Sequence, residues 1–77
     1  MQNTESIVYV RQTGDCEAEV YRPNTGYRYI VEYYDRLSPN DDQVLYLSFD
    51  SNGNWDTLHN PLNGATSRVY SVHKINY

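Results

Sequence analysis

Residues 43–58 read QVLYLSFDSNGNWDTL, and this stretch predicts two β-strands joined by a tight turn. Asn52-Gly53 at its centre is a strong signal for a two-residue type I′ turn, because both residue types tolerate positive φ. A two-residue loop at this point fixes the strand register. The predicted cross-strand pairs are Leu47 with Leu58, Ser48 with Thr57, Phe49 with Asp56, and Asp50 with Trp55.

The predicted register gives the hairpin two different faces, because side chains alternate along a strand. The face that we expect to line the core carries Leu45, Leu47, Phe49 and Leu58. The opposite face carries Tyr46, Ser48, Trp55 and Thr57. Trp55, the only tryptophan, is therefore predicted to lie away from the leucines, where either a second layer covers it or a partner reaches it.

Acidic and amide residues alternate through the same turn and resemble the ligand spacing of a calcium loop; they are Asp50, Asn52, Asn54 and Asp56. An EF-hand loop needs Gly at its sixth position and Glu at its twelfth. Those positions hold Trp55 and Pro61, so turn formation is the better interpretation. His59 and His73 lack the close spacing of a zinc pair, and we predict no metal or cofactor.

The 77 residues fit a single domain, which we divide into a flexible tail at residues 1–6 and a β domain at residues 7–77. A domain this small buries only about 60% of its unfolded surface, so a homodimer would add stability. The single cysteine, Cys16, suits a reducing compartment, and its alternating apolar neighbours predict a core position. Signal-peptide features and apolar spans of about 20 residues are lacking, so we expect a cytoplasmic protein without membrane contact.

Ten acidic and six basic residues give the chain a net charge of −4, which disfavours binding to nucleic acid through phosphate neutralisation. Tyrosine is unusually frequent, with nine residues against roughly two or three for an average composition. Tyrosine is common both in strands and at protein interfaces, so composition alone leaves both explanations open.

Two strands are predicted near the N-terminus, at residues 7–11 and 16–22, with a three-residue loop at 13–15 between them. This loop length places apolar residues opposite each other across the hairpin, namely Val8 with Val20 and Val10 with Ala18. The neighbours on the outward face are then Arg11 with Glu17, and Tyr9 with Glu19. Both outward pairs are compatible in charge and polarity.

A third strand is predicted at residues 27–35, after a four-residue turn at Pro23–Gly26. This turn length pairs Val20 with Tyr29, Ala18 with Val31, and Cys16 with Tyr33. The side chains predicted to point inward are Tyr27, Tyr29, Val31 and Tyr33. Glu17 then lies across from Glu32, and such a like-charge pair destabilises a sheet unless a cation is near.

The remaining segments complete an all-β pattern. Residues 36–42 and 59–65 are rich in turn formers, and residues 66–77 form a last strand whose facing is ambiguous. No segment has a helical period. A single open layer would leave its apolar face in water, so we predict an all-β single domain. It is an antiparallel meander of five to six strands rolled into a partial barrel.

The outward face of the first three strands carries the candidate protein-binding residues, which are Tyr9, Glu17, Glu19, Tyr21, Glu32 and Tyr34. Tyrosines offer rigid contact area, and carboxylates steer a basic partner. No nucleophile motif or phosphate-binding loop is recognisable, so we expect a non-catalytic protein. The first hypothesis is a protein-binding module that docks on a basic surface of a larger nucleic-acid-binding protein. It would act in the manner of small acidic inhibitors such as phage or plasmid counter-defence proteins.

Two alternative hypotheses use other aromatic side chains. Tyr46 and Trp55, on the predicted outer face of the central hairpin, could stack on a sugar or a peptide. The same two side chains could stack on the bases of a single-stranded nucleic acid, although the negative net charge disfavours this hypothesis.

Overall fold

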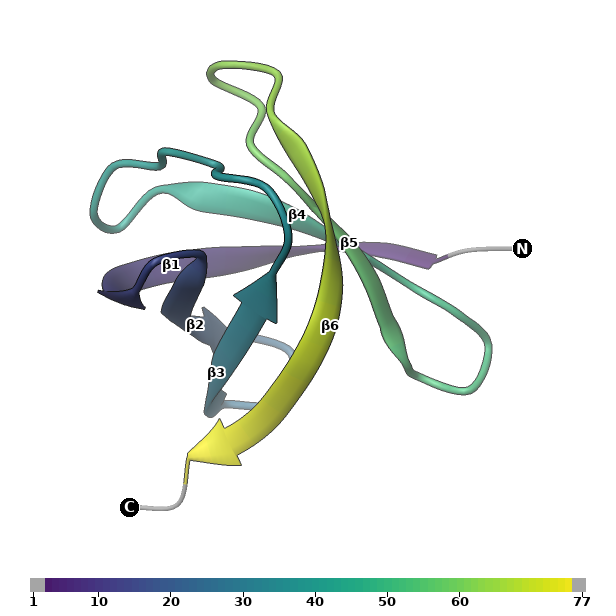
Figure 1. Ribbon diagram of the computed structural model, residues 1–77. Coiled ribbons are helices and arrows are strands. Elements are labelled where there is room, and N and C mark those ends of the chain that lie inside the picture. The colour runs from purple at the N-terminus through teal and green to yellow at the C-terminus, as the bar shows by residue number, and fades with distance from the viewer. Residues whose placement is uncertain (1–2, 76–77) are drawn as a thin grey trace.

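Six antiparallel β-strands form a closed barrel in residues 3–75, the part of the chain that the computed structural model describes (Figure 1). The strands are β1 (Asn3–Gly14), β2 (Glu17–Arg22), β3 (Tyr27–Tyr33), β4 (Val44–Phe49), β5 (Trp55–His59) and β6 (Thr66–Ile75). Their order around the barrel is β1-β2-β3-β6-β5-β4, and β4 pairs with β1. These residues contain no helix, and the all-β prediction is confirmed.

The strands form two three-stranded units, β1-β2-β3 and β4-β5-β6, in which consecutive strands are neighbours. The segment 34–43 connects these units and crosses one end of the barrel (Figure 1). As a result β4 pairs with β1, and β6 pairs with β3. The predicted rolled meander is therefore interrupted once, and every strand has a neighbour on each side.

Residues 3–6, predicted as part of a flexible tail, form the first part of β1 instead. They pair with β4, from Asn3 opposite Phe49 to Ser6 opposite Tyr46. Their polar composition favoured a tail, but backbone hydrogen bonds to a neighbouring strand do not depend on side-chain polarity. Residues 1–2 of the predicted tail lie outside the described residues.

The central hairpin has the predicted pairs of Leu47 with Leu58 and of Ser48 with Thr57. Beyond them a β-bulge inserts Asp56 as an extra residue in β5, so Phe49 pairs with Trp55 and not with Asp56. A bulge residue reverses the facing of the residues that follow it. Trp55 consequently packs against the core, and its predicted position on the face opposite the leucines is wrong.

The loop of this hairpin contains three residues, 51–53, and not the two that were predicted. The amide of Gly53 donates to the Asp50 carbonyl, and the Asp50 amide donates to the Asn54 carbonyl, both at 3.0 Å. Gly53 has a φ of 85°, whereas Asn52 is not among the residues with positive φ. The connection is therefore a type I turn closed by a left-handed glycine.

Irregularities in β1 change which of its side chains face the core. Tyr9 pairs with Val20, and the next pair skips Val10. Ile7 and Tyr9 are therefore buried in the positions that Val8 and Val10 were predicted to occupy. The predicted pairs that are wrong for this reason are Val8 with Val20 and Val10 with Ala18. A bulge inserts one residue into a strand and shifts the register beyond it.

The loop between β1 and β2 consists of Asp15 and Cys16, because Gly14 pairs with Glu17. Cys16 has a φ of 56° and precedes β2, so it is a turn residue and not the predicted strand residue. Its side chain is only partly buried and packs against the core from its margin, so Cys16 does not occupy the core position that was predicted.

The register between β2 and β3 is the predicted one. The pairs are Val20 with Tyr29, Ala18 with Val31, and Glu17 with Glu32. The fully buried apolar core comprises Ile7, Tyr9, Ala18, Val20, Val31, Tyr33, Leu37, Leu45, Leu47 and Leu58. Tyr29 and Phe49 pack against this core from its margin, as their predicted inward facing requires, whereas Tyr27 is half exposed at the start of β3.

The crossover segment 34–43 closes one end of the barrel, which we call the crossover end. Leu37 inserts there and is 1% exposed. The side-chain amides of Asn60 and Asn63 donate to the Leu37 carbonyl at 2.8 and 3.0 Å. The buried Asn60 also accepts hydrogen bonds from the Leu62 amide and the Gln43 side chain. Hydrogen bonds between uncharged groups thus hold Leu37 and the crossover segment in position.

The opposite end, which we call the ion-paired end, is closed by Arg22 and Glu5. The Arg22 guanidinium donates to both oxygens of the Glu5 carboxylate at 2.7 Å. It also lies over the rings of Phe49 and Trp55, with its central carbon 5.2 and 5.7 Å from their centroids. The hydrogen bond from Arg22 is the main reason that the pKa of Glu5 is lowered. A charged pair and aromatic rings therefore close this end.

Candidate protein-binding face

Glu17 and Glu32 lie opposite each other on adjacent strands, β2 and β3, with side chains on the outside of the barrel. The Glu17 carboxylate accepts a hydrogen bond from the Thr13 hydroxyl at 2.9 Å. Neither glutamate takes part in an ion pair with another residue in the range 3–75. Two directly opposed carboxylates repel each other, so this pair is a local source of unfavourable charge.

Tyr34 and Tyr70 lie beside this glutamate pair and are the most exposed tyrosines that the structure describes, at 65% and 54%. Their rings are 4.8 Å apart between centroids and tilted by 47°. Tyr70 stands at the irregularity in the pairing of β3 with β6, next to Ser71, which pairs with Glu32. A hydrogen bond from the Tyr70 hydroxyl to the Glu32 carboxylate raises the pKa of Tyr70.

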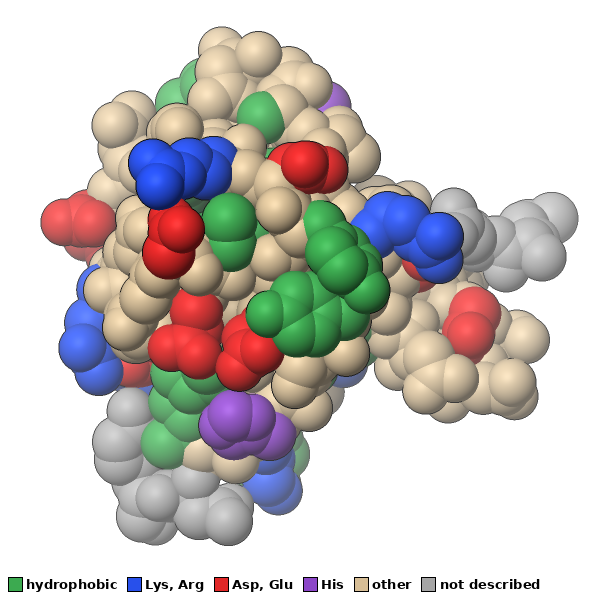
Figure 2. Space-filling model, viewed as in Figure 1, with side chains coloured by type: hydrophobic (Ala, Val, Ile, Leu, Met, Phe, Trp, Pro, Cys, Tyr) green, Lys and Arg blue, Asp and Glu red, His purple; other side chains and the backbone are tan. Residues whose placement is uncertain are grey.

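We call Glu17, Glu32, Tyr34 and Tyr70 the acidic tyrosine face. Figure 2 shows acidic and hydrophobic side chains adjoining one another on the side of the molecule where β3 and β6 lie in front. The exposed ion pair of Arg36 and Asp15, at 2.8 Å, joins the crossover segment to the loop between β1 and β2. The surface thus combines aromatic area with negative charge.

Two residues predicted for the binding face are buried. Tyr9 is 3% exposed and belongs to the core, because the irregular pairing of β1 turns it inward. Glu19 does lie between β1 and β3, but it is 2% exposed beneath Arg11 and Arg28, whose nitrogens donate to it at 3.0 and 2.9 Å. The hydrogen bond from Arg28 is the largest cause of the lowered pKa of Glu19.

Glu19 therefore supports the fold, and its charge is neutralised by two arginines. Tyr21 is half-buried and pairs with Arg28, away from the Glu17–Glu32 pair. Sequence reasoning missed Tyr70, because the last strand had no assigned facing. The clean alternation of the second and third strands located Glu17 and Glu32, but nothing local in the sequence marks the irregularity that brings Tyr70 to Glu32.

The alternative ligand-binding pair, Tyr46 and Trp55, is not brought together. Tyr46 is 41% exposed and pairs with His59 on the outside of β4. Trp55 faces inward, with its ring 5.1 Å from that of Tyr29. The two aromatic rings lie on opposite sides of the hairpin, so they cannot form one stacking site.

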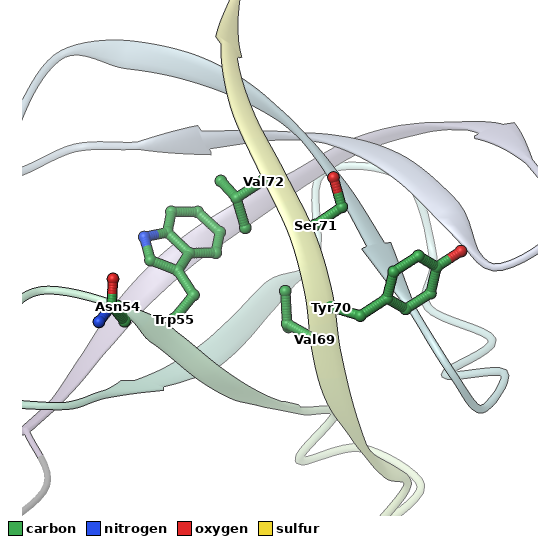
Figure 3. A pocket seen from close by; sticks show the side chains of 6 residues that line it. All are labelled: Asn54, Trp55, Val69, Tyr70, Ser71 and Val72. Atoms are coloured by element: carbon green, nitrogen blue, oxygen red, sulfur yellow. The ribbon is translucent and has the colours of Figure 1, made fainter.

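Trp55 instead lines a pocket of about 300 Å³ between β5 and β6 (Figure 3). The other lining residues are Asn54, Val69, Tyr70, Ser71 and Val72. Figure 3 shows Trp55 and Val72 on one side of β6, and Tyr70 and Ser71 projecting from the other side. Tyr70 thus belongs both to the pocket wall and to the acidic tyrosine face.

In the candidate calcium loop, backbone amides of the loop itself form hydrogen bonds to the Asp50 carboxylate. The Asp50 carboxylate accepts hydrogen bonds from the amides of Asn52 and Asn54, both at 2.9 Å, and these bonds lower the pKa of Asp50. Within residues 3–75 no cluster of three or more His, Cys, Asp or Glu side chains has the arrangement of a metal site. Nor do these residues form a helix with the length and apolarity needed to cross a membrane.

Comparison with known protein families found no matching family, and comparisons with curated proteins and with solved structures found no match either.

Proposed function

We propose that this protein is a non-catalytic protein-binding module whose acidic tyrosine face docks on a basic surface of a larger protein. The observation that supports this proposal is the exposed pair of Tyr34 and Tyr70, whose rings are in contact beside the opposed carboxylates of Glu17 and Glu32. Tyrosine rings supply contact area at a low entropic cost, and they are enriched at protein interfaces.

The charge of the face indicates a cationic partner. Glu17 and Glu32 have no ion-pair partner within residues 3–75, so a lysine or arginine of another protein would relieve their repulsion. Complementary charge also accelerates association and gives it a salt dependence. The net charge of −4 favours the same kind of partner.

The partner class that we propose is a nucleic-acid-binding protein in the cytoplasm. Such a protein carries a basic surface for phosphates, and an acidic module bound there would inhibit it by occupying that surface. Direct nucleic-acid binding by the module itself is disfavoured, because the exposed tyrosines lie next to carboxylates and not next to a basic groove.

The first test is a charge exchange on the acidic tyrosine face. Proteins retained by the immobilised wild-type chain are identified by mass spectrometry, and each is then measured against purified wild type and the Glu17→Lys, Glu32→Lys double variant. We expect the double variant to associate about tenfold or more slowly, because steering toward a basic surface is reversed. Raising the salt from about 0.05 to 0.5 M should weaken only the wild-type complex strongly.

Glu17→Gln with Glu32→Gln is the matched control, because it removes the charge at nearly constant shape and should have an intermediate effect. All variants should keep their melting temperature within the range of surface substitutions, about 0.5 kcal/mol in stability. Equal association rates and equal salt dependence for wild type and the lysine variant would exclude docking through this face.

A further inference from the structure

The seam between β5 and β6 is short compared with the length of β6. Thr57–His59 of β5 pairs with Thr66–Arg68 of β6. Strand β6 continues to Ile75, and from Val69 onward its strand partner within residues 3–75 is β3 alone. The edge of Val69–Ile75 that faces β5 therefore has backbone groups that pair with no strand in the described part of the chain.

The pocket lined by Trp55 lies at this open part of the seam. Trp55 and Val72 form its apolar part on one side of β6 (Figure 3). The Trp55 ring is fixed from within the barrel by Tyr29 and by the Arg22 guanidinium. A preformed apolar pocket beside an unpaired strand edge is the arrangement that proteins use to bind an extended peptide by strand addition.

The other side of the same edge is acidic. Tyr70 lines the pocket, and its hydroxyl also donates a hydrogen bond to the carboxylate of Glu32, which lies across from Glu17. Side chains of an added strand alternate between its two faces. Those that do not enter the pocket would lie toward the acidic tyrosine face, where carboxylates favour lysine or arginine.

We propose that Val69–Ile75 of β6 binds an extended segment of the partner as an added β-strand. An apolar side chain of this segment sits on Trp55 and Val72, and basic side chains at alternate positions lie on the outer face of the sheet, toward Glu32 on β3. The inference rests on the proposed function, because it identifies which part of the basic partner docks. The open edge is about 20–24 Å long at the rise of an extended chain, so it accommodates a segment of about seven residues.

The probe is a set of synthetic peptides, each of about nine residues, that alternate lysine with valine, leucine or phenylalanine. Trp55 is the only tryptophan, so its fluorescence reports occupation of the pocket. We expect saturable binding by at least one peptide, with a shift in Trp55 emission. Hydrogen exchange of the backbone amides in 69–75 that point to the open edge, followed by NMR, should slow about tenfold at saturation.

N-methylation of the peptide backbone separates strand pairing from charge attraction. An added strand presents alternate amides to β6 and the rest to solvent. Methylating one alternate set should therefore weaken binding about tenfold or more, and methylating the other set should leave it unchanged. Both methylated peptides keep every side chain and charge, so each is a matched control for the other.

The Glu17→Lys, Glu32→Lys variant makes failure of the two proposals distinguishable. If it loses binding while both methylated peptides bind equally, docking through the acidic tyrosine face stands and strand addition is overturned. If one methylated peptide fails and the charge variant binds normally, strand addition stands and the acidic face does not mediate docking. Absence of binding by the whole peptide set overturns strand addition. Protection of 69–75 in a dimer of the chain alone also overturns it, since the edge would then take a second copy.

Discussion

The two ends of the barrel are closed by different chemistry. At the crossover end, Leu37 is held by neutral hydrogen bonds from Asn60 and Asn63. At the ion-paired end, Arg22 bridges the Glu5 carboxylate and two aromatic rings. Neutral amides keep the same hydrogen bonds across the pH range, whereas a carboxylate loses its partner when it is protonated. The two closures should therefore respond differently to pH.

The largest effect is expected at the crossover end. Leu37→Ala removes a side chain that is 1% exposed and leaves a cavity under the connection. We expect a loss of about 2–5 kcal/mol, which is a large part of the roughly 4–12 kcal/mol expected for a domain of this length. Urea denaturation followed by circular dichroism measures it. Leu62→Ala, at a site that is 71% exposed, is the control and should change stability by less than about 0.5 kcal/mol.

A smaller and pH-dependent effect is expected at the ion-paired end. The pKa of Glu5 is lowered from its ordinary value of 4.5, mainly by the hydrogen bond from Arg22. Its ionised form is therefore favoured in the folded chain, and the pair stabilises the fold above about pH 4.5. This contribution is lost as the pH falls through the lowered pKa. Arg22→Met should cost about 1–3 kcal/mol at pH 7 and much less in acid.

The comparison is made by measuring wild type, Arg22→Met and Leu37→Ala at neutral pH and at about pH 3. Glu19 also has a lowered pKa, but Arg11 and Arg28 are present in all three proteins, so its contribution cancels in the differences. The wild-type advantage over Arg22→Met should shrink in acid, while the advantage over Leu37→Ala stays constant. Parallel pH dependence of both differences would show that the two ends are not chemically distinct.

The smallest effect concerns the turn that leads into the ion-paired end. Gly53→Val should destabilise by about 1 kcal/mol, because a β-branched residue is strained at a φ of 85°. A side chain at this position would meet no atom within 4 Å, so the backbone conformation alone causes the loss. Asn52→Val is the matched control and should change stability by less than about 0.5 kcal/mol, because Asn52 lacks positive φ. Equal losses of stability for Gly53→Val and Asn52→Val in thermal melts would instead favour the type I′ turn that the sequence predicted.

The sequence was sufficient to predict the elements in which strict alternation coincides with a well-defined turn. The register of β3 with β2 follows from the Pro23–Gly26 turn, and with it the burial of Val31 and Tyr33, although Tyr27 of the predicted inward set is half exposed. The leucine face of β4 follows from alternation. Alternation determines facing because a shift of one residue would expose the entire apolar set. The like-charge pair of Glu17 and Glu32 could therefore be located from the order of the residues alone.

The errors come from bulges. Val10 is an extra residue in β1, and its insertion buries Tyr9. Asp56 is an extra residue in β5, and its insertion turns Trp55 toward the core. The position of a bulge depends on how the strands pack around the whole barrel. The residues of the strand that contains it show no local pattern that marks it. The burial of Glu19 depends on Arg11 and Arg28 from two different strands, and that arrangement also could not be read from one segment.

The pairing of β1 with β4 and of β3 with β6 has a consequence for how the chain folds. Each three-stranded unit is built from neighbouring segments, but these two pairings join strands that are far apart in sequence. Contacts of that kind form after a large loss of loop entropy, and they slow folding. The hairpins can therefore form early. The pairing of β1 with β4 and of β3 with β6 should limit the folding rate. Substitutions that weaken the pairing of Asn3–Val8 with Val44–Phe49 would then slow the folding step in which water is excluded from the core.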